Sequence, residues 1–222
     1  MSTLRKVLVG TPALDGKVDC WYADSLFDSI KIGLYQGIDI IPSILHNESI
    51  LPMARNELLK MAYENNMESI VFIDDDERWH PQDLVDVINS PHEVFGLPVV
   101  SKTDNYGAYN IKLHDAQNPV HDSEGNLKVD GIGTGFLKIG RKALEALWDS
   151  SRDLHFRGKD IKMICEYGEI GTDFVSEDYN LCRKLRELGF EIWINPQQTV
   201  SHTGTKTWHG DFYEFLGRLT TG

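Results

Sequence analysis

The sequence predicts an α/β fold whose central sheet is mostly parallel and flanked by helices. Short runs of β-branched residues alternate with segments of helical periodicity in the N-terminal part of the chain, a pattern typical of parallel strand-helix units. The composition is that of a globular protein, with 41% hydrophobic and 25% charged residues among 222. From about Lys102 to Asp130 the chain is polar and rich in Asn, Asp and Gly, which predicts hairpins and loops there.

The expected strands are apolar runs that end at turn-forming residues. The first, Arg5–Val9, stops at Gly10-Thr11-Pro12. Ser69–Ile73 has the most buried character, because it is almost entirely apolar, and it leads directly into Asp74. The other expected strands are Ile38–Leu45, Val94–Val100, Gly131–Ile139 and Glu191–Asn195.

The expected helices carry apolar residues at three- and four-residue steps. In one of them Ser49 is the expected N-cap and Pro52 lies in the first turn. Its apolar stripe consists of Leu51, Ala54, Leu58 and Ala62. The other expected helices are Tyr22–Tyr35, one that begins at Pro81, Lys142–Trp148, and one capped by Ser176 and closed by Gly189. The segment Arg152–Phe174 has no clear period, which predicts a mobile loop.

The charge and cysteine content narrow the class of protein. The 34 Asp and Glu against 22 Lys and Arg give a net charge of −12, which disfavours broad electrostatic capture of nucleic acid. No apolar run approaches the roughly 20 residues of a membrane span, and no secretory signal is recognisable. A cytoplasmic protein with one domain over residues 1–222 is therefore expected. The three cysteines, Cys20, Cys165 and Cys182, form no CxxC pair, which indicates neither a disulfide framework nor a thiolate zinc site.

Three adjacent carboxylates, Asp74, Asp75 and Asp76, follow the strand Ser69–Ile73. They repel one another and need a cation, a basic partner or open water. Alternation along an extended segment lets Asp74 and Asp76 converge while Asp75 points elsewhere. Open α/β sheets bind ligands at the carboxyl ends of their strands, and hard oxygen ligands favour Mg²⁺ or Mn²⁺. The alternative is a solvated acidic turn.

Five segments in order carry a family resemblance: VLVGTPA at Val7–Ala13, MARNELLKMA at Met53–Ala62, VFIDDDE at Val71–Glu77, GIGTGFLKIGRKALEAL at Gly131–Leu147 and SEDYNLCRKLRELGFEIWINP at Ser176–Pro196. In these segments the chain resembles the GT-A glycosyltransferases, which use nucleotide sugars and carry a DxD motif at the end of a central strand. The resemblance implies a Rossmann-like sheet, a nucleotide-sugar half at about 1–100 and an acceptor half at about 101–222.

The resemblance also implies a metal site. It places Asp74 near the nucleotide ribose or the metal, makes Asp76 a direct ligand, and counts Asp75 among the substrate-binding residues. His202, in VSHTG, is similar to the C-terminal His that completes the metal shell in many members. A neutral imidazole is an acceptable Mn²⁺ ligand, and the expected cofactor is Mn²⁺ or Mg²⁺. The alternative for His202 is an exposed loop residue.

Further donor contacts follow from the same resemblance. Thr11 and Pro12 are expected to line the nucleobase pocket, and Arg55 to lie beside the diphosphate. A cation in the first turn of a helix is unfavourable with the helix dipole, which independently suggests that Arg55 faces an anion; a surface salt bridge is the alternative. Separately from the resemblance, the glycine pattern around Gly133 predicts close backbone approach to the sugar or a bulge, with Asp130 as a partner for the donor hexose.

The glycine pattern that contains Gly133 is GxGxG. It lacks the GxGxxG spacing of a dinucleotide fold and precedes a strand, so we reject that fold.

Glu177 and Asp178, both expected to be catalytic residues, follow Ser176 in a segment that matches the family's xED motif. In inverting members the Asp of this motif is the general base, and a carboxylate within reach of a sugar hydroxyl is what that step requires. Acids in a first helical turn are also stabilised by the helix dipole without any catalytic role.

The sequence thus predicts a metal-dependent, inverting glycosyltransferase that uses a nucleoside diphosphate sugar. A glycan acceptor is favoured over nucleic acid, with a modified DNA base still open. A sugar-phosphate nucleotidyltransferase is an alternative, although GTPALDGK lacks the Arg expected after the first strand. A non-catalytic nucleotide- or glycan-binding relative is the other.

Overall fold

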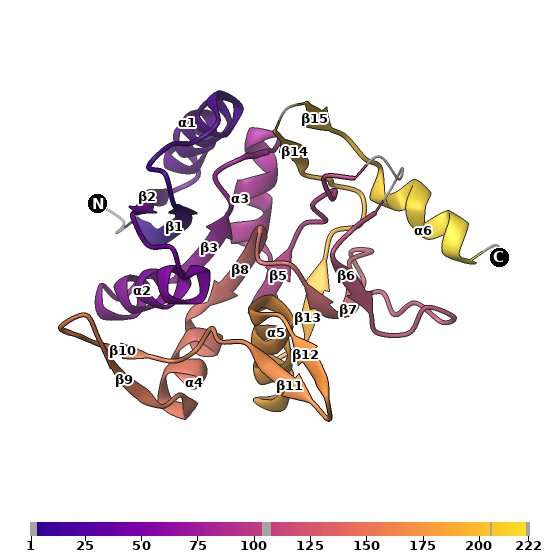
Figure 1. The fold of residues 1–222 in the computed structure, drawn as a ribbon. Coiled ribbons are helices and arrows are strands. Elements are labelled where there is room, and N and C mark those ends of the chain that lie inside the picture. Colours follow the sequence, from indigo (N-terminus) through magenta and orange to yellow (C-terminus); the bar gives the residue numbers. More distant parts are fainter. Residues whose placement is uncertain (1–3, 104–107, 205, 221–222) are drawn as a thin grey trace.

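An eight-stranded sheet forms the centre of the protein. The computed structural model describes residues 4–103, 108–204 and 206–220. The strands of this sheet are β1 (Arg5–Ala13), β2 (Ile38–His46), β3 (Ser69–Ile73), β5 (Val94–Gly96), β6 (Ile111–Leu113), β7 (Leu127–Ile132), β8 (Phe136–Gly140) and β13 (Ile192–Ile194). They are ordered β2-β1-β3-β8-β5-β13-β7-β6 (Figure 1), and β7 and β8 run antiparallel to their neighbours while the others share one direction.

Helices cover both faces of the sheet (Figure 1). They are α1 (Cys20–Tyr35), α2 (Leu51–Glu64), α3 (Pro81–Asn89), α4 (Arg141–Ser150), α5 (Glu177–Glu187) and α6 (Phe212–Thr220). Because successive strand side chains point to opposite faces, Val7 and Val9 pack with α1 and α3, whereas Leu8 packs on the side of α2, α4 and α5. The predicted α/β fold with a mostly parallel sheet flanked by helices is confirmed.

Several predicted boundaries are wrong. β1 continues to Ala13, because β2 pairs with it over its whole length. β5 ends at Gly96, four residues before the predicted end. The predicted strand Gly131–Ile139 is split into the end of β7 and most of β8, which are not neighbours in the sheet. The N-cap of α2 is Ile50, without a side-chain cap, in place of Ser49.

The segment predicted as a mobile loop forms two hairpins. The first consists of β9 (Asp153–Phe156) and β10 (Lys159–Lys162), and the second of β11 (Gly168–Ile170) and β12 (Asp173–Val175). Arg157 and Gly158 have φ angles of 48° and 79°, as the two central residues of a type I′ turn require. The strands are too short for their periodicity to be recognised in the sequence.

A small sheet lies at the carboxyl end of β3. It consists of β4 (Glu77–Arg78), β14 (Ser201–Thr203) and β15 (Thr207–Trp208), in the order β15-β14-β4. His202 is paired with Glu77 in its register. The C-terminal tail is thereby fixed against the acidic segment that follows β3.

The structure bears on two features considered from the composition, membrane-spanning helices and the state of the cysteines. In the described part of the chain, no helix combines the length and the apolar character that crossing a membrane requires. Cys20, Cys165 and Cys182 are all free thiols.

Candidate active site

A cavity of about 500 Å³ opens where β3 ends. Its wall is built from the start of α2, the turn between β7 and β8, the start of α5, β14 and the loop after β5. The residues predicted from the sequence that line it are Arg55, Asp74, Gly133, Glu177, Asp178 and His202. The fold therefore brings six of the eleven predicted site residues to one cavity.

Arg55 is an interior cation of this wall. Its side chain is 3% exposed, and it donates to Glu177 and, at 3.3 Å, to Oδ1 of Asp74. Burial opposes the charge of the guanidinium, but the neighbouring carboxylates, Asp74 first among them, outweigh it and raise the pKa of Arg55. Arg55 thus faces anions. This was expected because a cation near a helix N-terminus is unfavourable without an anionic partner.

Asp76 is held by two partners. Its Oδ1 lies 3.1 Å from Nε2 of His202, and its Oδ2 accepts a hydrogen bond from the Lys102 ammonium. Burial opposes ionisation of Asp76, but the interactions with His202 and Lys102 outweigh it and hold the pKa of Asp76 below the ordinary value. Asp76 is not part of the cavity wall itself, but both of its partners are.

The orientation of His202 bears on metal binding. Its Nδ1 lies 3.1 Å from the Val100 carbonyl oxygen, so a neutral ring donates its proton there and directs the lone pair of Nε2 toward Asp76. Two acceptors that face each other need a proton or a cation between them. Two ligands at right angles on an ion with bonds of about 2.1 Å lie about 3.0 Å apart. The separation and chemistry of Asp76 and His202 therefore fit a divalent ion.

The third predicted ligand is placed differently. Asp74 lines the cavity, but its Oδ1 is paired with Arg55. Among residues 4–103, 108–204 and 206–220, no three His, Cys, Asp or Glu side chains are grouped closely enough to hold a metal ion. The geometry thus supplies two of the three predicted ligands in contact with each other.

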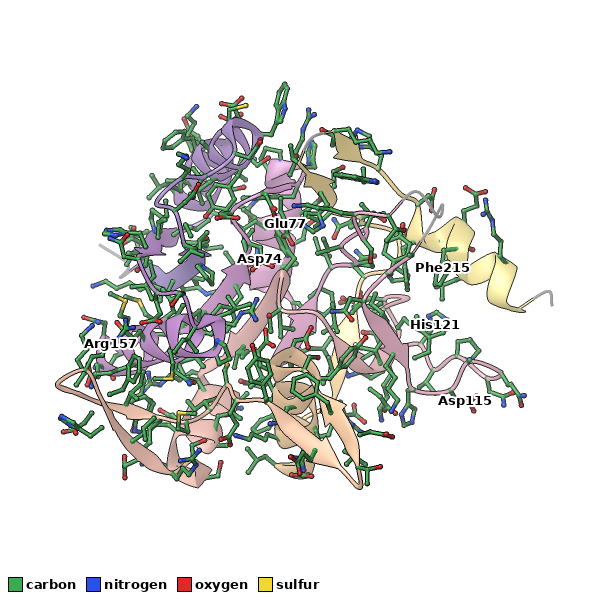
Figure 2. The ribbon with its side chains drawn as sticks, viewed as in Figure 1. Asp74, Glu77, Asp115, His121, Arg157 and Phe215 are labelled. Carbon is green, nitrogen blue, oxygen red and sulfur yellow. The ribbon has the colours of Figure 1, made fainter. Side chains whose placement is uncertain are left out.

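Glu77 completes the acidic segment and was given no role from the sequence. Its side chain is fully buried, and burial, then the charges of Asp74 and Asp76, raise its pKa well above the ordinary value. A Cβ on Gly135 would collide with its carboxylate. Figure 2 shows Asp74 and Glu77 next to each other near the centre of the fold. Glu77 is therefore an enclosed acid in the cavity wall, where burial disfavours its charged form.

Asp75 lies outside the cavity wall, and its backbone carbonyl accepts from the N–H of Asp19. Burial, followed by repulsion from Asp76 and Asp74, raises the pKa of Asp75 to about 6. Asp75 and Asp76 lie in a turn and not in an extended segment, and only Asp74 of the three lines the cavity, so the expected alternation does not describe the triplet.

Asp178 lies in the first turn of α5 and is 8% exposed. Its Oδ1 accepts from the Ser176 hydroxyl and, at 2.7 Å, from the Tyr179 backbone N–H, and its Oδ2 accepts from Nδ2 of Asn110 at 2.8 Å. Ser176 is the N-cap residue as predicted, but its hydroxyl orients Asp178 and makes no side-chain cap. The carboxylate is fixed at the cavity wall, and Oδ2 keeps a lone pair for a further partner.

Three predicted donor contacts lie elsewhere. Thr11 is fully buried, with its hydroxyl 2.5 Å from the Tyr22 hydroxyl of α1, and neither it nor Pro12 lines the cavity. The continuation of β1 alongside β2 causes this placement. Asp130 faces a separate cavity of about 550 Å³, where it pairs with His114 at 2.8 Å and with Arg186 at 3.7 Å.

Among the lining residues that the sequence did not predict are Glu77, Lys102 and Asn110, which lie next to predicted site residues. Glu77 was detectable as the fourth acid in a row. Lys102 and Asn110 belong to a polar stretch without periodicity, so no local pattern marks them.

No protein-family model matches the chain, and no curated protein matches it. Among solved structures it is similar to A197 from STIV, at 16% identity over 90% of this chain and 86% of that one, with a TM-score of 0.53. It is also matched to a glycosyltransferase involved in glycosylation of the major capsid of PBCV-1, at 13% identity, coverage of 63% and 61%, and a TM-score of 0.33. A third match is the inositol-1-phosphate CTP transferase from T. maritima, at 10% identity, coverage of 100% and 98%, and a TM-score of 0.44. The likeness to A197 indicates a shared fold, and the other two are too distant to support an argument about activity.

Proposed function

We propose that this protein is a metal-dependent glycosyltransferase that moves a sugar from a nucleoside diphosphate sugar to an acceptor hydroxyl. One observation carries the proposal: the buried cation Arg55, the oriented carboxylate Asp178 and His202, which contacts Asp76, line one cavity. A cation and a metal-binding pair suit a diphosphate, and a fixed carboxylate suits deprotonation of a hydroxyl. The sequence resemblance to GT-A enzymes supports the same assignment.

Asp178 is the proposed general base. It takes the proton of the acceptor hydroxyl as that oxygen forms its bond to the anomeric carbon, and the bond from that carbon to the diphosphate breaks with both electrons on the leaving oxygen. Glu177 is engaged by Arg55, so we assign it the positioning of Arg55. A single displacement of this kind inverts the anomeric centre.

Asp76 and His202 are the proposed metal ligands, and Asp74, which is paired with Arg55, is proposed to lie near the nucleotide ribose. When bound to Asp76 and His202, Mn²⁺ or Mg²⁺ supplies Lewis-acid stabilisation of the departing diphosphate. Arg55 lies beside Asp74 and adds a fixed positive charge near this position. We propose a glycan as acceptor, because the net charge of −12 opposes broad capture of nucleic acid.

The test is the thermal stability of the protein with UDP-, GDP-, CMP- and dTDP-sugars, each with and without Mn²⁺. A donor at about one hundred times its Kd stabilises the fold by roughly 2.7 kcal/mol. We expect one donor class to raise Tm in a Mn²⁺-dependent way, and Asp76→Ala to abolish that dependence.

Asp115→Ala is the matched control, because Asp115 lies on a peripheral loop far from Asp74 (Figure 2). It keeps the donor-induced shift. A shift that is unchanged in Asp76→Ala contradicts the metal assignment. Pyrophosphate release from a nucleoside triphosphate and a sugar phosphate, without sugar transfer, identifies a nucleotidyltransferase instead.

A further inference from the structure

The Lys102 ammonium is bound to the carboxylate of Asp76, which is a proposed metal ligand. It contacts Oδ2 of Asp76, while His202 faces Oδ1. Both carboxylate oxygens are thus engaged in the structure. The Lys102 side chain is 34% exposed and that of Asp76 is 33% exposed, so neither is locked in the interior.

A divalent ion on Asp76 and Lys102 on Asp76 oppose each other. Two cations on one carboxylate repel, and each weakens the field that attracts the other. Lysine is a point charge on a flexible four-carbon stem, so its ammonium can leave one partner without any backbone change. Arg55, in contrast, is buried and tied to Glu177.

The displaced ammonium stays near the reaction site, because Lys102 itself lines the cavity of about 500 Å³. Among the described residues of that lining, the cationic side chains are those of Arg55 and Lys102. Since Arg55 is already paired with two carboxylates, Lys102 is the cation that an incoming diphosphate can recruit.

We propose that Lys102 is a tethered cation that competes with the divalent ion for Asp76 and, once displaced, binds the phosphate groups of the donor. This inference rests on the proposed metal-dependent function. It assigns Lys102 two roles of opposite sign: it weakens binding of the metal alone and strengthens binding of phosphate to the metal-loaded protein.

The experiment is calorimetric titration of the full chain with Mn²⁺ alone, followed by inorganic pyrophosphate on the Mn²⁺-saturated protein. Lys102→Met is compared with the wild type and with Lys128→Met, a matched control whose ion pair with Glu191 spans 2.7 Å. We expect Lys102→Met to bind Mn²⁺ about fivefold more tightly, in line with the loss of one competing ion pair, and to bind pyrophosphate about fivefold more weakly. Lys128→Met behaves as the wild type.

Two further measurements distinguish the causes. Repetition of the titrations at high salt distinguishes direct competition by Lys102 from a long-range electrostatic effect, because exposed charges beyond the Debye length are screened. The increase in Mn²⁺ affinity of Lys102→Met persists at high salt if Lys102 competes directly. It disappears if the effect is long-range. Lys102→Gln repeats the test should the Met variant fold poorly.

The role of Lys102 is overturned if Lys102→Met binds Mn²⁺ no more tightly than the wild type does. In that case, loss of Mn²⁺ binding in Asp76→Ala still supports the proposed metal site. Mn²⁺ binding that Asp76→Ala does not weaken, or no Mn²⁺ binding by any variant, overturns the metal site and with it this inference. Unchanged pyrophosphate affinity overturns the phosphate-binding role.

Discussion

Arg55 and Glu177 form an interior ion pair between residues 122 positions apart in the sequence. It joins the start of α2 to the start of α5, and Asp178 is the next residue along α5. The pair therefore couples the position of the proposed base to the position of the fixed positive charge of Arg55.

Removal of Arg55 leaves Glu177 and Asp74 without their counter-charge. Because loss of one partner strands a buried charge, we expect Arg55→Met to lower the free energy of unfolding by about 3–5 kcal/mol. The double variant Arg55→Met/Glu177→Gln recovers part of this loss. Urea denaturation of the two single variants and the double variant measures the coupling. A double variant whose loss equals the sum of the single losses shows that the pair is not coupled.

Asp178→Asn keeps the shape of the side chain and removes the base. Donor-induced stabilisation stays as in the wild type, whereas sugar transfer falls by at least about a hundredfold, since positioned bases contribute about 10²–10⁴. Glu187→Gln, at the other end of α5, is the control and retains transfer. Near-normal transfer in Asp178→Asn removes this residue from the mechanism.

A methyl group added at Gly133 would contact Asn110 in the candidate active site. A Cβ there would lie 2.9 Å from Nδ2 of Asn110, and the same nitrogen donates to Asp178. We expect Gly133→Ala to lower the transfer rate about tenfold, equivalent to about 1.4 kcal/mol, with little change in Tm. Gly217→Ala, where nothing lies within 4 Å of the new methyl, is the control.

A double-mutant cycle identifies the cause of the Gly133 effect. In an Asn110→Ala background the added methyl has no amide to displace, so Gly133→Ala costs no further rate there. An equal loss in both backgrounds shows that Asn110 does not mediate the effect.

Lys138 on β8 gives the stability a pH dependence. Burial lowers the pKa of Lys138 to about 8, and its ammonium donates to the Ser90 carbonyl at 2.7 Å. The native pKa is below the unfolded one, so the cost of burying the charge is fully present below pH 8 and is relieved as the pH rises toward 10.5. Lys138→Met is therefore more stable than the wild type at pH 7, by about 2 kcal/mol after allowance for the lost hydrogen bond.

Urea denaturation of both proteins from pH 7 to 10.5 measures this effect. The difference in free energy of unfolding narrows as the pH rises, because the wild type gains stability. A difference that is constant with pH contradicts the assignment to Lys138.

Local patterns carried much of the prediction. The apolar run Ser69–Ile73 is β3 at the predicted bounds, and the acids that follow it lie at the carboxyl end of a central strand. Where pairing decides a boundary, local patterns failed: β1 continues to Ala13 because β2 lies alongside it. The hairpins of residues 153–175 were not predicted for a related reason. Their strands of three and four residues are stabilised by pairing with the neighbouring strand and not by a local sequence pattern.

The sequence by itself determined the alternation of strands and helices and the positions of Asp74 and Asp178 at element ends, because backbone geometry gives helices and strands fixed side-chain periods. Tertiary structure alone decided that Lys102 meets Asp76, that Asn110 meets Asp178, and that Thr11 and Asp130 do not line the same cavity. Contacts between distant segments depend on the order of the strands in the sheet and on the paths of the loops. Local sequence periodicity contains no information about strand order or loop paths.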